Sequence, residues 1–155
     1  MKVLMFGWEF PPMNTGGLGT ACYGLTKGLS QNNVSIVLVL PQASTETEKA
    51  GFLKIRNANV ARIKVKSVKS SMAPYMSPSD YENYMMRAKG RKPIYGSILF
   101  EEVERFAQQA AIIAKEEDFD IIHAHDWMTY KAGLAAKKAS GKPLVVHVHA
   151  TEFDR

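Results

Sequence analysis

The chain has 155 residues, of which 46% are hydrophobic and 23% are charged, and its formal net charge is +5. These are ordinary values for a globular domain, and they exclude a chain that is disordered throughout. The basic residues are spread along the chain without interleaved aromatic side chains, so we expect solvated surfaces and no nucleic-acid partner. No apolar run approaches the ~20 residues of a membrane span. The single cysteine, Cys22, excludes an internal disulfide and suits the reducing cytoplasm, where we expect the protein to act.

The N-terminal part of the chain predicts a strand, a glycine-rich loop, a helix and a second strand. Residues 2–7 form a short apolar run, and residues 8–19 hold two prolines and three glycines. From Leu18 onward apolar side chains recur at helical spacing as far as Asn32. Residues 34–40 are again apolar and largely β-branched, which is typical of a buried strand. A helix that joins two such strands predicts that they are parallel.

Further strands and helices extend this α/β pattern. Residues 60–68 alternate apolar and basic side chains, which predicts a half-exposed edge strand whose lysines discourage unwanted pairing. Residues 97–117 and 128–140 carry helical stripes, and short apolar strands are expected at 120–125 and 144–149. We therefore predict one Rossmann-like domain over the whole chain. Its sheet would be open, parallel and doubly wound, with strand order about 3-2-1-4-5.

Small and polar residues mark the expected helix ends. We expect Ser79 to cap a short helix at residues 79–88 and Ser97 to cap the helix that follows. Asp126 precedes the last helix and would cap it in the same way. Gly141 comes directly after that helix, where a residue of positive φ is common.

The glycine-rich loop after the first strand is the first candidate site. Gly16 and Gly17 open a helix, and the first amides of a helix have no acceptor within it, so they suit a phosphate or diphosphate. The loop lacks the GxGxxG spacing of the dinucleotide fingerprint, and a turn that needs glycine only for its geometry is the alternative. Glu9, beside this loop, would either bind a sugar hydroxyl or accept hydrogen bonds from loop amides.

Two histidine-rich segments follow strands in the second half of the chain, at the edge where open α/β sheets bind ligands. His123 and His125 share one face of their strand, which would allow a metal pair, but no third ligand has matching spacing and we expect no metal. Trp127 is expected to be exposed and to stack on a sugar. His147 is interpreted as a core histidine, and His149, at the strand tip, as a functional one.

Together these motifs resemble the N-terminal domain of GT-B glycosyltransferases, which have two facing Rossmann-like domains. The resemblance is nearest to the retaining glycogen and starch synthase-like enzymes and covers the chain from residue 1 to residue 155. It rests on four segments in chain order: Glu9-Phe10-Pro11-Pro12, Gly16-Gly17-Leu18-Gly19, His123-Ala124-His125-Asp126-Trp127 and His149.

The resemblance implies a hexosyltransferase that moves a sugar, glucose by analogy, from a nucleotide sugar of UDP- or ADP-glucose type to a glucan or other acceptor. It implies retention of configuration, no cofactor and no obligatory metal. Gly16 and Gly17 would approach the donor diphosphate, and His149 would hydrogen-bond the transferred sugar as the catalytic residue. The acceptor and sugar side of the site would be lined by Glu9, Asp126, Trp127 and Glu152.

Two features depart from that family pattern. Bacterial glycogen synthases carry Lys-x-Gly-Gly, and Asn14 stands in the place of the lysine here, which favours another branch of the group over ADP-glucose use. The C-terminal domain that holds most nucleotide contacts in the family is missing from these residues. We therefore expect a truncated N-terminal half with negligible activity alone and with that domain as its partner. The alternative is a non-catalytic module that binds a nucleotide or sugar phosphate, or a regulatory subunit.

Overall fold

The computed structural model describes residues 1–11, 16–41, 63–68 and 97–151. The short helix expected at residues 79–88 and the candidate residue Glu152 lie outside these ranges. The described elements are, in chain order, β1 (Lys2–Phe6), α1 (Gly17–Gln31), β2 (Ser35–Leu40), β3 (Ile63–Ser67), α3 (Ser97–Glu116), β4 (Ile121–His125), α4 (Trp127–Ser140) and β5 (Leu144–His147).

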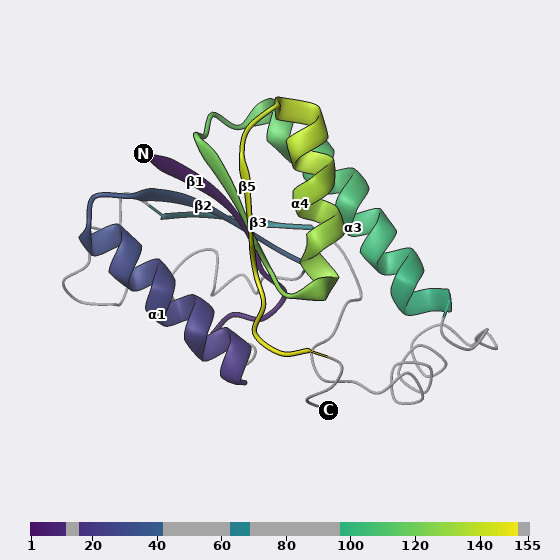
Figure 1. Ribbon diagram of the computed structural model, residues 1–155, viewed down its shortest axis with the longest axis horizontal. Coiled ribbons are helices and arrows are strands. Elements are labelled where there is room, and N and C mark those ends of the chain that lie inside the picture. Colours follow the sequence, from purple (N-terminus) through teal and green to yellow (C-terminus); the bar gives the residue numbers. More distant parts are fainter. Residues whose placement is uncertain (12–15, 42–62, 69–96, 152–155) are drawn as a thin grey trace.

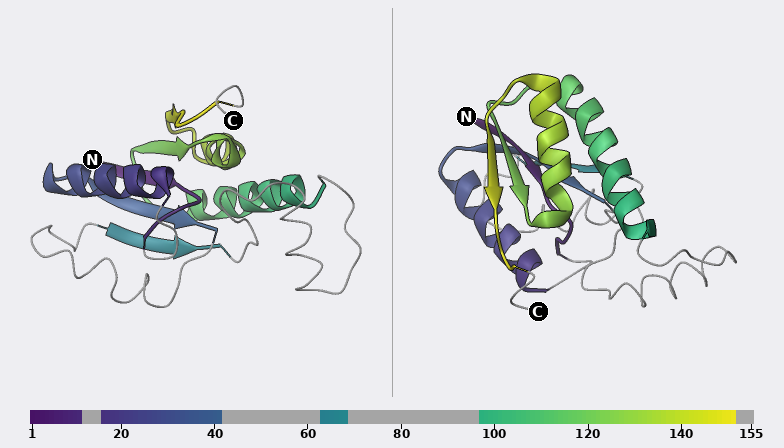
Figure 2. Two further views of the ribbon diagram at one scale, coloured as in Figure 1. Left: turned by 90° about the horizontal axis from the view of Figure 1, so that it is seen from below. Right: turned by 45° about the vertical axis from the view of Figure 1, so that its right-hand side comes forward.

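The described strands form one sheet in the order β3-β2-β1-β4-β5, and every neighbouring pair is parallel (Figure 1). The predicted strand order and fold class are confirmed, including the edge strand, which runs over Ile63–Ser67. Helix α1 covers one face of the sheet, and α3 and α4 cover the other (Figures 1 and 2). The chain leaves β1 first toward β2 and later toward β4, so the strand order reverses at β1. In doubly wound sheets that reversal places the ligand site at the carboxyl ends of the central strands.

The core lies between the central strands and the helices on either side. Strands β1 and β2 are buried almost completely because both of their faces are covered, which explains their continuous apolar runs. Phe6 of β1 meets Phe106 of α3 edge-to-face, with ring centroids 6.1 Å apart. Val103, Phe106 and Ala110 form the buried stripe that the sequence predicts for α3, and Leu99 is half-buried at its start.

The helix ends agree with the predictions only in part. Gly141 has φ of 72°, the left-handed conformation expected directly after α4. Helix α3 begins at Ser97 itself, and the cap predicted at this residue stays a prediction, since nothing is described of its side chain. Among the described residues, no helix combines the length and the apolar character needed to cross a membrane.

Helix α4 packs closely on the sheet at Gly133, and this contact shows which side chains of β4 face α4. A Cβ atom at Gly133 would lie 3.0 Å from Cβ of Ala124 and 2.8 Å from Cδ1 of Leu144. Ala124 therefore faces α4. Because side chains alternate along a strand, His123 and His125 face the opposite side of the sheet, which α1 covers.

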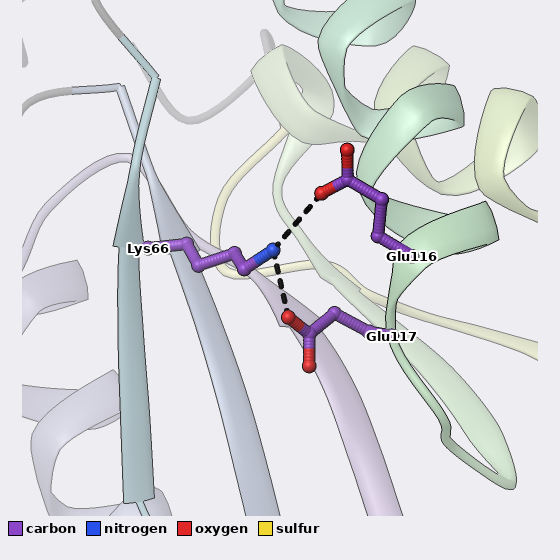
Figure 3. Close-up of polar contacts among 3 residues, drawn as sticks. All are labelled: Lys66, Glu116 and Glu117. Atoms are coloured by element: carbon purple, nitrogen blue, oxygen red, sulfur yellow. Dashed lines mark hydrogen bonds and ion pairs between the residues drawn. The ribbon is translucent and has the colours of Figure 1, made fainter.

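The edge strand β3 is joined to the C-terminal end of α3 by an ion-pair cluster (Figure 3). Nζ of Lys66 lies 2.7 Å from Oε1 of Glu117 and 3.3 Å from Oε2 of Glu116. The hydrogen bond to Glu117, followed by the bond to Glu116 and the charges of both carboxylates, raises the pKa of Lys66. The sequence explains the lysines of this strand by protection of a free edge. For Lys66 the structure shows a different use, since its ammonium group is engaged by two carboxylates.

Candidate functional site

The carboxyl ends of β1, β4 and β5 meet the N-terminal half of α1 on one side of the sheet (Figures 1 and 2). Just after β1, Oε2 of Glu9 accepts a hydrogen bond of 3.0 Å from the amide of Gly19 in α1. One ligand atom from each of Cys22, His125 and His149 lies within 4.8 Å of the others. Segments from both ends of the chain thus converge at one place, which is the arrangement that the sugar-transfer hypothesis requires.

All four histidines of the chain form one cluster on the α1 side of this edge. His125 is opposite His147 in the parallel register, and the imidazole of His147 stacks on that of His149 with centroids 4.2 Å apart. Nδ1 of His125 lies 2.8 Å from Nε2 of His149, which is a hydrogen bond. The interpretation of His147 as a core residue is wrong, because His147 is exposed and its ring stacks on those of His123 and His149.

Burial favours the neutral form of three imidazoles in this cluster, those of His123, His125 and His149. Burial lowers the pKa of His125 to about 3 and that of His123 to about 4, and repulsion from the neighbouring imidazoles adds to the effect. Burial and His147 also lower the pKa of His149, partly opposed by the charge of Asp126. A neutral imidazole carries one donor and one acceptor nitrogen. Nε2 of His123 and Nε2 of His125 are buried and have no hydrogen-bond partner among the described residues.

Asp126 holds a strained turn between β4 and α4. Its φ is 63°, a conformation that costs about 1–3 kcal/mol in a residue other than glycine. Hydrogen bonds fix the turn: the amide of Asp126 donates to the carbonyl of His147, and Oγ1 of Thr129 donates to the carbonyl of His125. Although Asp126 occupies the N-cap position of α4, its side chain does not cap the helix, so the capping prediction is wrong. Its Oδ1 is buried and has no partner among the described residues.

Glu9 and Cys22 form the α1 side of the site. Glu9 is 1% exposed, and burial raises the pKa of its carboxyl, while the bond from Gly19 lowers it. Of the two alternatives weighed for Glu9, the structure shows the loop-amide contact through Oε2, while Oε1 has no partner among the described residues. Burial, with the charges of Glu9 and Asp126, raises the pKa of Cys22 to about 12. The buried thiol is therefore protonated at neutral pH.

The start of α1 leaves space at the glycine pair. Gly16 is the N-cap residue, with an extended backbone, and its carbonyl accepts a hydrogen bond of 3.0 Å from the amide of Thr20. A Cβ atom at Gly17 would meet no atom within 4 Å, and the φ of Gly17 is not positive. Neither packing nor backbone conformation requires glycine at position 17, so the alternative of a purely geometric glycine has no support there.

Trp127 differs from the expectation for an exposed stacking platform. Its indole is half-buried and packs against Phe100 of α3, with ring centroids 6.1 Å apart. Nε1 is buried without a partner among the described residues. The sequence prediction also missed Cys22 and His147 as members of the site, because each faces the cluster from a different element. The repeated His-x-His pattern in neighbouring parallel strands was the signal that could have found His147.

The model of a known family, described as the starch synthase catalytic domain, matches residues 2–155. The chain belongs to the starch synthase catalytic domain family. It is thus a glycosyltransferase domain of the glycogen synthase-like type, as the four short motifs predict. No individual residue role follows from this assignment alone.

Individual relatives are distant in sequence and longer than this starch synthase-type chain. An uncharacterized glycosyltransferase of Methanocaldococcus jannaschii is 26% identical over 155 residues, which are 100% of this chain and 32% of that protein. A glycogen synthase of Mycobacterium tuberculosis is 25% identical over 158 residues, 100% of this chain and 35% of that protein. The chain therefore spans about a third of the length of these relatives.

One solved structure supports the fold. It is described as a UGT transferase from Siraitia grosvenorii in complex with UDP, and it is similar with a TM-score of 0.53. The match covers 94% of this chain and 27% of that chain at 12% sequence identity. At this identity the likeness extends to the Rossmann-like arrangement of strands and helices and to nothing finer.

Proposed function

We propose that this chain is the N-terminal, acceptor-side domain of a retaining hexosyltransferase that moves glucose from a nucleotide sugar to a glucan or other carbohydrate acceptor. The observation that carries the proposal is the convergence of Glu9, Asp126, His149 and the first turn of α1 at one edge of the sheet. Family membership supplies the class of reaction. A C-terminal domain holding most of the donor contacts would complete the site.

The start of α1 would bind the donor diphosphate. Amides of the first helical turn carry partial positive charge and favour an anion. Because Glu9 already accepts the hydrogen bond of Gly19, the diphosphate would use the amides at Gly16 and Gly17, and a Cβ at Gly17 would meet only open space. Donors fixed before the reaction would stabilise the negative charge that develops on the leaving diphosphate.

His149 would hydrogen-bond the transferred sugar. Its imidazole is neutral, and Nε2 is engaged by Nδ1 of His125 at 2.8 Å. If His125 donates in this bond, His149 accepts at Nε2 and carries its own proton on Nδ1. That N–H would then be the donor to a sugar hydroxyl, and His125 would be a positioning residue that sets the tautomer.

The acceptor and remaining sugar hydroxyls would lie toward Asp126. Its Oδ1 has no partner among the described residues, so a hydroxyl hydrogen bond would offset the cost of burying it. Trp127 would contact the sugar through the edge of its half-buried indole, and Glu9 and Glu152 would line the same side. Sugar transfer would proceed without a cofactor or an obligatory metal. We place this activity in the cytoplasm, since a single free cysteine suits a reducing compartment.

The experiment is to measure turnover of UDP-glucose and ADP-glucose by the 155-residue chain and by the full-length product of its gene. We expect turnover only in a polypeptide that also contains a donor-binding domain, because this half alone cannot exclude water or position the donor. A comparable rate in the isolated chain would refute the two-domain proposal. Tight calorimetric binding of UDP or ADP by the isolated chain, without turnover in any form, would favour the nucleotide-binding module instead.

A further inference from the structure

The histidine cluster has a second property that does not depend on sugar transfer. One ligand nitrogen from each of His123, His125 and His147 lies within 4.8 Å of the others. The first two alternate on β4, and the parallel register places the third on β5 directly opposite His125. The spacing of histidines within β4 alone does not reveal this third imidazole, because a neighbouring strand supplies it.

Two imidazoles of this triad have a buried nitrogen without a hydrogen-bond partner among the described residues. Nε2 of His123 and Nε2 of His125 are both buried and make no hydrogen bond to the described residues, and His125 is 0% exposed. A buried polar atom without a partner is costly, and a coordinated cation would supply the missing interaction. Nδ1 of His125 is already bonded to His149, so Nε2 is the nitrogen left to coordinate. Metal-bound imidazoles are commonly oriented by such a bond from their second nitrogen.

We propose that His123, His125 and His147 bind a divalent transition-metal ion, with Zn²⁺ as the best match, through three imidazole nitrogens and one water. Three histidines and a water are an established zinc ligand set, and imidazole disfavours Mg²⁺ and Ca²⁺. At Zn–N distances of about 2.0–2.1 Å, tetrahedral geometry needs nitrogens about 3.3 Å apart. The three nitrogens lie within 4.8 Å of one another, so binding would have to shorten the longest of these separations by no more than about 1.5 Å.

A second triad, Cys22, His125 and His149, also has its ligand atoms within 4.8 Å. It is the weaker candidate because the buried, protonated thiol of Cys22 would have to lose its proton before it could bind a metal ion. The two triads share His125. An ion on Nε2 of His125 would hold the proton of that ring on Nδ1, facing His149, so the bound ion would fix the tautomer of the pair.

The test is to titrate Zn²⁺ into the 155-residue chain by calorimetry and Co²⁺ by visible absorption. We expect one ion per chain and the absorption of tetrahedral cobalt without a thiolate-to-cobalt band. His147→Gln should weaken binding about tenfold or more, since even loss of an outer-shell partner costs ~10–100-fold. Cys22→Ser, which removes a ligand of the second triad only, should bind as the unaltered chain does.

Thermal unfolding separates loss of the site from loss of the fold. Zn²⁺ should raise the melting temperature of the unaltered chain and of Cys22→Ser, but not that of His147→Gln or His147→Asn. His147 is exposed, so both variants should fold. Equal Zn²⁺ affinity in His147→Gln, no binding by the unaltered chain, or a thiolate band that disappears in Cys22→Ser would each overturn the proposal.

Discussion

Two clusters of polar side chains lie on this sheet. In one of them the charged groups pair with each other, and in the other several buried polar atoms have no hydrogen-bond partner among the described residues. At the β3 edge, Lys66 is engaged by Glu116 and Glu117 in a closed ion-pair cluster (Figure 3). At the carboxyl ends of β1, β4 and β5, buried polar atoms have no partner among the described residues. These atoms are Oε1 of Glu9, Nε2 of His123, Nε2 of His125 and Oδ1 of Asp126.

The contrast separates a stabilising cluster from a functional one. A closed pair contributes to folding and needs no ligand, whereas unpaired buried groups cost stability until something binds them. The second cluster also contains the strained backbone of Asp126 and imidazoles whose pKa values are lowered by burial. Strain and shifted pKa values concentrate at functional sites. Changes in the second cluster should therefore affect activity, and changes in the first should affect stability.

The largest expected effect is on catalysis at His149. In the full-length product of the gene, His149→Gln should lower kcat about 10²–10³-fold, the range for removing one preorganised donor at a reacting centre. Lys66→Met is the matched control and should leave kcat within about twofold, because it belongs to the other cluster. Steady-state rates with saturating nucleotide sugar measure both. An unchanged kcat in His149→Gln would contradict the role proposed for this imidazole.

Acid should destabilise the chain through the histidine cluster. The folded pKa values of His123 and His125 are about 4 and about 3, below the ~6.5 of an unfolded histidine. As the pH falls below about 6.5, the unfolded chain takes up protons that the folded chain excludes. The free energy of unfolding should therefore fall by up to about 1.4 kcal/mol per pH unit for each of these two histidines.

Urea unfolding at several pH values between about 7.5 and 5 measures this slope. His125→Gln removes one of the two titrating groups and should flatten it, whereas Lys142→Met, an exposed change away from the cluster, should not. Equal free energies of unfolding at the two ends of the range would contradict the effect.

The closed cluster predicts a smaller effect, on stability alone. Lys66→Met should lower the free energy of unfolding by about 1–2 kcal/mol, because it removes the ammonium group that the Glu117 side chain, 7% exposed, binds. Lys142→Met is the matched control and should change stability by less than about 0.5 kcal/mol. Chemical denaturation of the three proteins at neutral pH compares them, and equal stabilities would show that the cluster contributes nothing.

The sequence determined most of the fold and part of the site. Apolar runs and helical stripes predicted the strand order, because burial on both faces of β1 and β2 leaves few alternatives. The site was predicted less well where tertiary contacts decide. Asp126 looked like an ordinary cap, but the bond from its amide to the His147 carbonyl holds it at positive φ. Trp127 looked exposed because Phe100, which covers it, is remote in the sequence.

The smallest expected effect concerns the glycines of α1. Substitutions there change neither the ion-pair cluster nor the histidine cluster, so they separate an effect on function from an effect on stability. Gly17 and Gly24 both lie in α1, and a Cβ at either would meet no atom within 4 Å. Alanine at each should leave stability unchanged or raise it by up to about 1 kcal/mol, since it only removes glycine's cost in a helix.

The two substitutions should differ only in function. A methyl group at Gly17 would occupy space proposed for the donor diphosphate, so KM for the nucleotide sugar should rise several-fold in Gly17→Ala while Gly24→Ala keeps the original value. Denaturant unfolding and the KM for the donor, measured on the same preparations of both variants, separate an effect on stability from an effect on donor binding. If both variants kept the original KM, the amides at the start of α1 would not approach the donor, and the glycine at position 17 would need another explanation than packing, backbone conformation or binding.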